Sequence, residues 1–384
     1  MSPRTPAVVV VGAGPVGLTA ALTLAQRGIH VTVLEQGAAL ATESRASTFH
    51  PPTLEMLEKL GVLEPLLEKG IVAETFQYRA RGGGEIATLD LGVLAADTAY
   101  PFRVQCEQSK LTPILRAALP ATAEVLFGHQ VRSLRADTGR VVLDTASGPI
   151  EADWVIGADG AHSAVRQALG VDFHGSTYPE RFLVASVDED LADVLPGIAP
   201  INYVFDPDEW LVLLRTPEHW RVLLPTPDGT DDAAELRRLP ARLTAVADLG
   251  RPWRLLHASL YRVHQRVTER FRHGRVLLMG DAAHVNNPLG GLGMNSGIHD
   301  AVVLAGALAD VLGGAPDVVL DRAAAYRRTV AIDHVQRTSH DNWTRLRARD
   351  NSGHARLRAL ADDPVAARAY LRRACLLDVL AQRP

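Results

Sequence analysis

The sequence contains very little cysteine and no long apolar run. Its 384 residues include two cysteines, Cys106 and Cys375, without metal-ligand spacing, so neither a disulfide framework nor a metal site is expected. No stretch approaches the roughly 18 uninterrupted apolar residues of a membrane-spanning helix. The apolar run AVVVVGAG near the N-terminus fits a buried strand better than the core of a signal peptide. We therefore expect a cytoplasmic protein without a membrane span.

The sequence also lacks a charge excess and internal repeats. The net charge of −4 gives no reason to expect binding to nucleic acid or to an anionic membrane. No segment recurs at a fixed period, which argues against a solenoid or propeller. The apolar fraction of 47% and the length suit a globular protein with two domains of ordinary size.

A dinucleotide-binding pattern occupies residues 7–36. The β-branched run Val8–Val11 predicts a buried parallel strand, and Gly12, Gly14 and Gly17 follow it as GxGxxG at the start of a helix. Such glycines allow a tight turn, close approach of a pyrophosphate and close helix–strand packing. Glu35 ends the second strand, where a carboxylate can accept a hydrogen bond from a ribose hydroxyl.

Two further loops follow predicted buried strands. GADGAHSAVR, residues 157–166, places Asp159 at the carboxyl end of a strand, where ligands of α/β sheets bind. Asp159 is a candidate for bonding ribityl or ribose hydroxyls, with Arg166 bracing the loop; the alternative is an Asp–Gly turn that ends in a helix N-cap at Ser163. The second loop, 280–295, reads GDAAHVNNPLGGLGMN before an apolar helix, whose N-terminus favours negative charge.

The segment 172–267 is rich in strands and aromatic residues. An antiparallel sheet with one aromatic face is suited to a flat substrate, although for any single aromatic residue core packing is the better explanation. The pattern 233–249 predicts a pair of helices. The aromatic residues are Phe182, Tyr203, Phe205, Trp210, Trp220, Trp253 and Tyr261.

The three motifs, taken in order, resemble those of the single-component FAD-dependent aromatic hydroxylases, whose type member is para-hydroxybenzoate hydroxylase. The resemblance covers nearly the whole chain and corresponds to a short form without the C-terminal thioredoxin-like domain of longer relatives. It implies an α/β fold with a Rossmann-like FAD-binding domain, a mixed or antiparallel substrate-binding sheet and C-terminal helices. The implied FAD-binding domain comprises 1–74, 101–171 and 268–320, the substrate domain 75–100 and 172–267, and the helical segment 321–384.

The resemblance also assigns cofactor contacts. Gly12, Gly14, Gly17 and Glu35 are expected to hold the ADP half. Arg45 and Gln105 match contacts to the ribityl–pyrophosphate region, although position alone allows Arg45 to be a surface residue. Asp159 falls in a motif that serves both FAD and NAD(P)H, Asp281 meets the ribityl chain, and His284 is structural. The isoalloxazine ring is expected along Pro288, Gly290, Gly291, Leu292, Met294 and Asn295.

The implied reaction is hydroxylation of an aromatic substrate, phenolic or polyketide-type, by O2 and NAD(P)H through a flavin C4a-hydroperoxide. A phenol needs a base near its hydroxyl, and Tyr203, His50, Arg215 and His257 are candidates. Alternatives are a flavin-dependent halogenase, an epoxidase and a non-catalytic FAD-binding accessory protein; the sequence lacks the Trp-x-Trp-x-Ile-Pro segment of the halogenases. The resemblance leaves a homodimer open.

Overall fold

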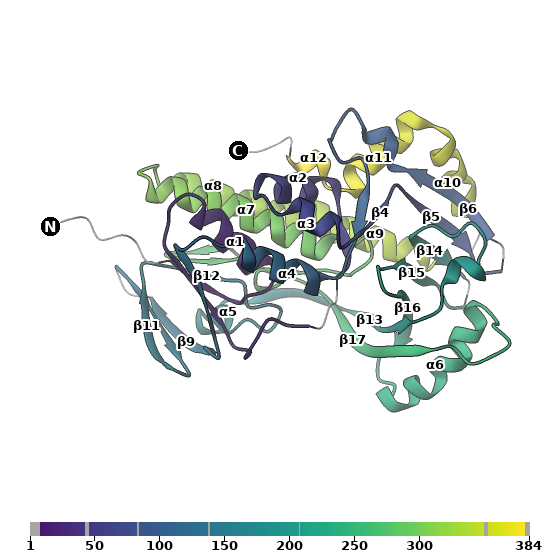
Figure 1. Ribbon diagram of the computed structural model, residues 1–384, viewed down its shortest axis with the longest axis horizontal. Coiled ribbons are helices and arrows are strands. Elements are labelled where there is room, and N and C mark those ends of the chain that lie inside the picture. The colour runs from purple at the N-terminus through teal and green to yellow at the C-terminus, as the bar shows by residue number, and fades with distance from the viewer. Residues whose placement is uncertain are drawn as a thin grey trace.

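Two large β-sheets and the helices around them form the molecule, shown in Figure 1. The computed structural model describes residues 8–42, 46–82, 84–136, 139–206, 208–348 and 352–380. The two longest strands, β13 (Phe173–Val187) and β17 (Leu255–Thr268), pair with each other and run from one sheet region to the other. No helix in the described ranges is both long and apolar enough to cross a bilayer.

The first sheet contains six strands in the order β18-β19-β12-β1-β2-β8. Five of them run parallel, and the short β18 is antiparallel to β19 at the edge. The parallel strands read as near-continuous apolar runs because both faces are covered. The strands are β1 (Val8–Val11), β2 (Val31–Glu35), β8 (Ala123–Phe127), β12 (Trp154–Gly157), β18 (Arg272–His273) and β19 (Val276–Leu278).

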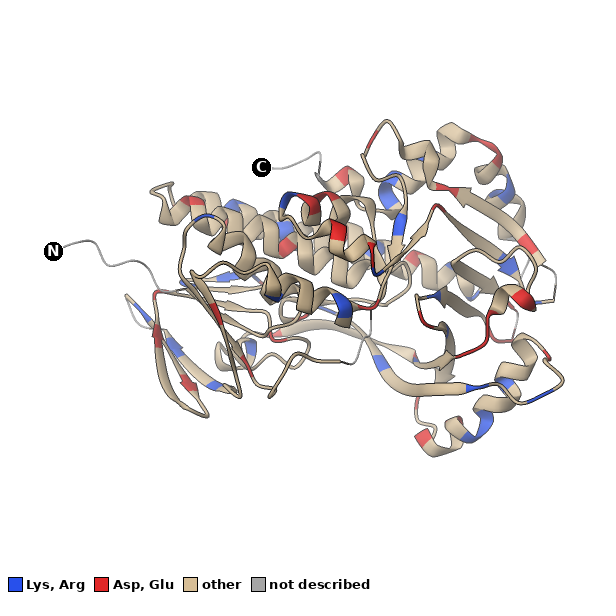
Figure 2. Ribbon diagram, in the orientation of Figure 1, with Lys and Arg blue, Asp and Glu red and all other residues tan. Residues whose placement is uncertain are grey.

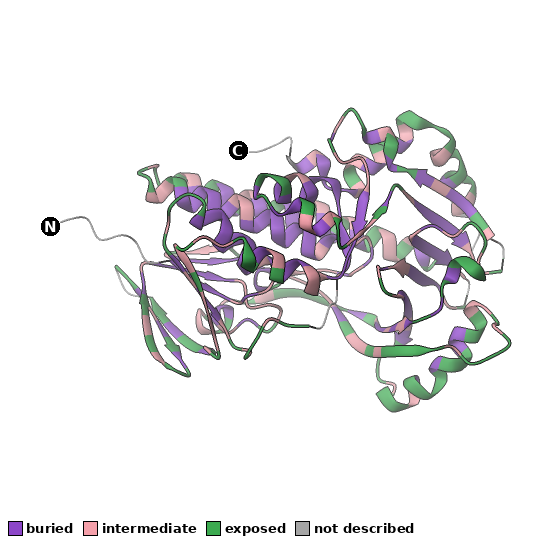
Figure 3. Ribbon diagram, in the orientation of Figure 1, coloured by how far each residue is buried: buried purple, intermediate pink, exposed green. Residues whose placement is uncertain are grey.

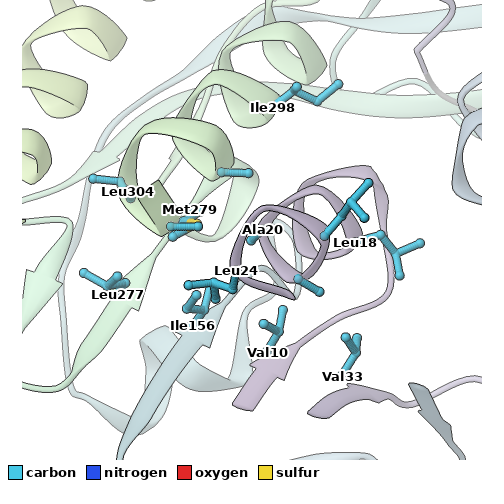
Figure 4. Packing of buried hydrophobic residues seen from close by; sticks show 14 of the residues in the cluster. Val10, Leu18, Ala20, Leu24, Val33, Ile156, Leu277, Met279, Ile298 and Leu304 are labelled. Atoms are coloured by element: carbon cyan, nitrogen blue, oxygen red, sulfur yellow. The ribbon is translucent and has the colours of Figure 1, made fainter. Parts of the chain in front are cut away.

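Two central helices cover this sheet. Helices α1 (Pro15–Ala25) and α7 (Leu292–Leu312) pack against each other, and their apolar side chains meet those of β1, β12 and β19 (Figure 4). Helix α7 is buried along most of its length (Figure 3), and most of its buried residues are small or apolar; the buried polar exceptions are Asn295, Ser296, His299 and Asp300. The same core receives α4 (Gln108–Ala117), α5 (Ala164–Ala168) and an antiparallel meander of β9 (Val131–Ala136), β10 (Val141–Thr145) and β11 (Gly148–Ala152).

The second sheet has eight strands in the order β20-β17-β13-β16-β15-β14-β5-β6. All neighbours are antiparallel except β14 and β5, which are parallel. Its remaining strands are β5 (Thr75–Ala80), β6 (Gly84–Asp90), β14 (Ile201–Phe205), β15 (Leu211–Arg215), β16 (Trp220–Pro227) and β20 (His284–Val285). The predicted combination of a parallel sheet, a mixed sheet and C-terminal helices is confirmed.

The predicted helix pair at 233–249 is wrong. A single helix, α6 (Asp232–Val246), passes through Pro240 and packs Leu239 and Leu243 against one face of the second sheet. Pro240 cannot donate to the carbonyl of Leu236, but it lies on the exposed side, where water can replace that bond. The helix therefore continues.

A small three-stranded sheet carries residues that approach both large sheets. It consists of β3 (Thr48–Phe49), β7 (Arg103–Gln105) and β4 (Ile71–Ala73), with β7 in the centre. Helices α2 (Pro51–Lys59) and α3 (Leu63–Leu67) lie between its strands in the sequence. Short 3-10 turns occur at Leu91–Leu94, Leu191–Asp193 and Gly280–Ala282.

The C-terminal helices begin with a continuous rod. Helix α8 (Val318–Val330) passes through a π-helix (Ala331–Gln336) into α9 (Arg337–Leu346). The amide of Gln336 donates to the carbonyls of Arg266 and Val285, at 3.0 and 3.4 Å, and so ties the π-helix to the second sheet. Helices α10 (Ser352–Asp362), α11 (Pro364–Ala374) and α12 (Leu377–Leu380) complete the segment.

Candidate active site

The GxGxxG turn forms an open cradle at the start of α1. Gly12 has φ +104°, and a Cβ there would lie 2.5 Å from the carbonyl oxygen of Ala158. A Cβ at Gly17 would lie 1.9 Å from the carbonyl oxygen of Gly12, whereas the space beside Gly14 is open to 4 Å. No described side chain caps α1, so its first amides remain available. This cradle suits a pyrophosphate, because helix N-termini bind anions through free amides.

Glu35 is held in place at the end of β2. Its Oε2 accepts from the amide of Ala13 at 2.9 Å, and its Oε1 accepts from the amide of Gly37 at 2.8 Å. Each carboxylate oxygen keeps a second lone pair. The carboxylate therefore both fixes the turn after β1 and can accept from a ribose hydroxyl.

The other two motif loops are joined to each other. Both oxygens of Asp159 serve the loop itself, accepting from Ser163 Oγ at 2.6 Å and the amide of Val165 at 3.1 Å. Burial raises the pKa of Asp159 above its ordinary value, and these hydrogen bonds oppose the shift. Ser163 caps α5, as one explanation of the sequence required. A contact of Asp159 with cofactor hydroxyls stays a prediction.

Arg166 braces the loop as expected. It donates to the carbonyls of Ala161 and Ala282, the second in the loop that carries Asp281. Asp281 itself is exposed in the 3-10 turn.

The loop before α7 has the backbone that a ring system needs for close approach. Gly290 and Gly291 have φ +107° and +68°, and a Cβ at Gly291 would lie 3.0 Å from Thr48 Cβ. His50 Nε2 donates to the carbonyl of Gly290 at 2.8 Å. Because no side chain of the described residues caps α7, its first amides can face an anionic ring edge.

Asn295 clamps this loop rather than presenting its side chain outward. Its Oδ1 accepts from His50 N and Thr53 Oγ1 at 2.9 and 2.6 Å, and its Nδ2 donates to the carbonyls of Thr48 and Gly291 at 2.8 and 2.6 Å. With all four bonds made in a buried position, its side chain supports the loop.

The remaining predicted contacts have different surroundings. Gln105 is buried and exchanges hydrogen bonds with Thr48 at 3.1–3.2 Å, beside Gly291. The Leu292 side chain packs with Val330 and Val335, so only its backbone can approach a ring. Met294 belongs to the core of the first sheet, and Pro288 is half-buried at the loop start. Arg45 lies outside the described residues.

A buried ionic cluster beneath the loops was not predicted. Asp300 accepts from Arg327 Nε at 2.6 Å, from His284 Nε2 at 2.8 Å and from the amide of Gly280 at 3.1 Å. Burial opposes ionisation, but Arg327 and His284 hold the pKa of Asp300 below its ordinary value. The cluster fixes the turn before Asp281 and gives His284 the structural role that was expected. In the sequence, the spacing of His284 and Asp300 on either side of the start of α7 is the one signal that could have indicated this ionic cluster.

The aromatic residues of the second sheet divide between its faces. Phe182, Phe205, Trp210 and Tyr261 share one face with Tyr203. Trp220 and Trp253 lie on the other, with α6, because side chains alternate along a strand. The aromatic face is therefore narrower than the sequence suggested and includes Phe76 and Tyr78 from β5.

The four candidate bases are not gathered at one point. Tyr203 is buried on the aromatic face, and His50 is buried beside Gly290. Arg215 lies with its guanidinium 5.9 Å from the ring centroid of Trp220, on the opposite face from Tyr203. His257 is exposed near the beginning of β17. Of the four, His50 hydrogen-bonds to the predicted ring loop, and Tyr203 lies on the aromatic face.

Arg103 acts electrostatically on both His50 and Tyr203 and was missed. It lies in β7, is 3% exposed and has its guanidinium 4.5 Å from the ring centroid of Phe76. It lowers the pKa of both neighbours: with burial as the larger cause, it depresses that of His50 well below 6.5, and it opposes the burial that raises that of Tyr203. The sequence FRVQ predicted only a strand.

A cradle for a pyrophosphate, a ribose-facing acid and a glycine loop beside an aromatic sheet define the class of an FAD-dependent aromatic monooxygenase. The chain belongs to the family described as FAD binding domain, whose model matches residues 5–338. It is 36% identical to para-nitrophenol 4-monooxygenase of Pseudomonas sp. strain WBC-3, over 97% of this chain and 94% of the relative. It is 34% identical to 6-hydroxy-3-succinoylpyridine 3-monooxygenase of Pseudomonas putida, over 88% of each chain.

Solved structures agree with these relatives. The p-nitrophenol 4-monooxygenase of Pseudomonas putida DLL-E4 matches with a TM-score of 0.89 at 35% identity, over 96% of this chain and 98% of the other. Aklavinone-11 hydroxylase, solved with FAD and aklavinone, matches with a TM-score of 0.79 at 26% identity, over 90% and 70%. The predicted family and enzyme class are confirmed, and the hydroxylase interpretation is favoured over the halogenase, epoxidase and accessory-protein alternatives.

Proposed function

We infer that the protein hydroxylates a phenolic or polyketide-type aromatic ring with FAD, O2 and NAD(P)H. The overall reaction inserts one oxygen atom into an aromatic C–H bond while NAD(P)H is oxidised, and the other oxygen atom leaves as water. Bound FAD would supply the redox chemistry, taking a hydride from NAD(P)H and activating O2. The names of the relatives support an aromatic substrate, and the presence of a single GxGxxG motif supports a nicotinamide cofactor that binds only transiently.

The chain's own residues would bind and orient the flavin. Gly12, Gly14 and the amides of α1 fit the pyrophosphate, and Glu35 fits the adenosine ribose. Gln105, at the end of β7, and Asp281, in the 3-10 turn, would serve the ribityl chain. Amides at the start of α7 would stabilise negative charge on the reduced ring. The surrounding core would limit the entry of water, which strengthens these electrostatic effects.

One observation carries the substrate assignment: His50 links Gly290, at the ring loop, to the neighbourhood of Arg103 and Tyr203. A substrate on the aromatic face would therefore lie beside the flavin. This supports residues 1–74, 101–171 and 268–320 as the FAD-binding domain, 75–100 and 172–267 as the substrate domain, and 321–384 as a covering helical segment. Tyr203 and His50 remain the candidate bases, whereas the positions of Arg215 and His257 argue against them.

The proposal includes two further points about the protein's setting. Cys106 and Cys375 are buried free thiols, which supports a reducing compartment such as the cytoplasm. A homodimer is testable by sedimentation of the purified protein, where a single species of the monomer mass would argue against it.

The test is a screen of phenols for acceleration of NADH or NADPH oxidation by the FAD-loaded protein. We expect at least one phenol to yield a product that gains one oxygen atom from 18O2, detected by mass spectrometry. Stimulated oxidation that yields only hydrogen peroxide with every phenol would instead favour the accessory-protein interpretation. Comparing the two nicotinamides in the same assay identifies the preferred electron donor.

A further inference from the structure

The second sheet has a cavity on the face that α6 covers, opposite the aromatic face. The cavity lies between the strands, the end of α6 and the loop after the 3-10 turn Leu191–Asp193, and its volume is about 220 Å³; Figure 1 shows α6 beside these strands. Most of its wall is apolar and is formed by Leu195, Val204, Leu211, Leu213 and Val246. We refer to this space as the α6-face cavity.

Arg79 contributes a charge to the wall of this cavity, although it is only 8% exposed. The alternation of side chains along β5 directs Tyr78 to the aromatic face and Arg79 to the other. Val204, which pairs with Arg79 in the register of β14 and β5, lines the same space. The Nη1 atom of Arg79 donates to Gln77 Oε1 at 2.7 Å, and Nη2 donates to the carbonyl oxygen of Pro196 at 3.5 Å. Both acceptors are neutral, so they leave the guanidinium charge uncompensated.

Two other arginines on this face have acidic partners. Arg81, which also lines the cavity, lies 3.9 Å from a carboxylate oxygen of Asp206 and 3.4 Å from one of Glu209. Arg242, in α6, lies 2.7 Å from a carboxylate oxygen of Glu209. Basic and acidic residues are interspersed in this way over the molecule (Figure 2). The charges of Arg81 and Arg242 are therefore neutralised locally, and the charge of Arg79 is not.

The acid that acts on Arg79 does so without contact. Glu85, the cross-strand partner of Arg79 in β6, raises its pKa, but burial lowers that pKa by more. The Glu85 carboxylate accepts from Thr88 Oγ1 at 2.6 Å, and Arg79 forms no ion pair within the described part of the chain. Arginine stays protonated in proteins, and an uncompensated buried charge is costly. A bound anion would remove that cost.

The geometry points to a second ligand site in the α6-face cavity, for a short-chain monocarboxylate whose carboxylate faces the Arg79 guanidinium and whose hydrocarbon chain lies along the apolar wall. The planar guanidinium matches a carboxylate with two parallel hydrogen bonds. The volume equals that of roughly seven waters in the liquid and is smaller than the roughly 300 Å³ of pockets for drug-sized ligands. A single uncompensated cation and an apolar wall suit a monoanion with a hydrocarbon part. The site is independent of the proposed hydroxylase activity, because the sheet separates it from the aromatic face.

The experiment is a 13C NMR titration of the FAD-loaded protein near neutral pH. The probe is hexanoate labelled at its carboxyl carbon, and hexanamide labelled at the same carbon is a neutral compound of similar size. We expect saturable binding of hexanoate, and binding of hexanamide that is at least about tenfold weaker, because the charge-assisted hydrogen bonds are lost. Absence of saturable hexanoate binding, or equal affinity for the two compounds, would overturn the proposal.

Arg79→Met tests the charge while it retains an apolar stem. It should weaken hexanoate binding about tenfold or more and leave hexanamide binding within about twofold. Gln77 Oε1 keeps a bond from the amide of Ala199 at 3.2 Å, so the variant does not leave this buried oxygen without a donor. Arg237→Met, at an exposed position on α6, is the matched control and should bind hexanoate like the wild type. Unchanged hexanoate affinity in Arg79→Met would contradict the site.

Val246→Phe tests the place of binding. Val246 is half-buried at the end of α6, and a larger side chain there would fill part of the cavity. Both hexanoate and hexanamide should bind at least about tenfold more weakly, with FAD retained. Hexanoate that binds on the aromatic face instead would be insensitive to both Arg79→Met and Val246→Phe, and that result would overturn the proposal. If Val246→Phe does not fold, the comparison of the two probes in Arg79→Met decides.

Discussion

Arg166 Nη1 donates to the carbonyl oxygen of Ala282 at 3.0 Å, and this bond joins the loops that follow β12 and β19. These two parallel strands are neighbours, yet their motifs lie more than a hundred residues apart in the sequence. The same guanidinium donates to Ala161 at 2.7 Å and stacks 4.0 Å from the Phe173 ring centroid. One side chain therefore sets the relative position of two predicted flavin-binding loops.

Replacing Arg166 should loosen both loops. Arg166→Met leaves two carbonyls, one of them buried, without their donor, and we expect FAD affinity to fall roughly tenfold. Fluorescence titration of the apoprotein with FAD measures this dissociation constant. Arg116→Met, at an exposed position on α4, should leave it unchanged. An unaltered dissociation constant in Arg166→Met would show that the loops hold their positions without this side chain.

Glu35→Ala should also weaken FAD binding, through the cradle that would hold the ADP half. The variant loses an acceptor for a ribose hydroxyl, worth about 1.5–3 kcal/mol, and also the bonds from Ala13 and Gly37 that fix the cradle. We expect at least about a tenfold rise in the FAD dissociation constant. Glu124→Ala, on the exposed edge of neighbouring β8, is the control. Equal affinities in the two variants would argue against the ribose contact.

Gly291→Val tests the loop expected along the flavin ring. Gly291 has φ +68°, and a side chain there would press on Thr48, so a β-branched residue is both strained and in collision. We expect weaker FAD binding and a higher ratio of hydrogen peroxide to hydroxylated product per NAD(P)H consumed. Gly139→Val is the control, since Gly139 has open space and no positive φ. Full coupling in Gly291→Val would place a different loop against the ring.

His50 should make the folded state sensitive to acid. Burial, aided by Arg103, lowers the pKa of His50 well below 6.5. Below pH 6.5 the unfolded chain therefore binds a proton at His50 before the folded protein does. The stability should therefore fall as the pH drops through about 6.5, by up to about 1.4 kcal/mol per pH unit from this group. Urea unfolding between pH 8 and pH 5.5 measures the slope. His50→Gln should flatten it, and His257→Gln, at an exposed position, should not.

The cofactor motifs were predictable from the sequence because their signals are local. Gly12, Gly17 and Glu35 follow or end apolar strands, and the spacing alone constrains their geometry. The Asp300–Arg327 pair was not predictable in this way, since its members lie in two helices and meet only after packing. The residue type alone does not reveal that Arg103 is buried, and the pattern of its strand did not indicate what surrounds it.

The sequence also did not reveal which face of the second sheet each side chain lies on. All five residues of β14, including Tyr203, are buried, because the C-terminal helices cover one face and α6 the other. A strand buried on both sides shows no alternation that would tell its faces apart. The assignment of Arg215 and Trp220 to the α6 face therefore required the strand register, in which they are paired neighbours.

The π-helix at Ala331–Gln336 determines in which direction each side chain of α9 points. A residue deleted from this turn would restore ordinary α-helical winding and rotate α9 by about 100° about its axis. Trp343 would then leave Glu180, and Arg345 would leave the hydroxyls of Tyr78 and Tyr370. The one extra residue that a π-turn holds thus suffices to aim one face of α9 at the aromatic sheet, and a chain with ordinary winding here would present a different set of side chains to that sheet.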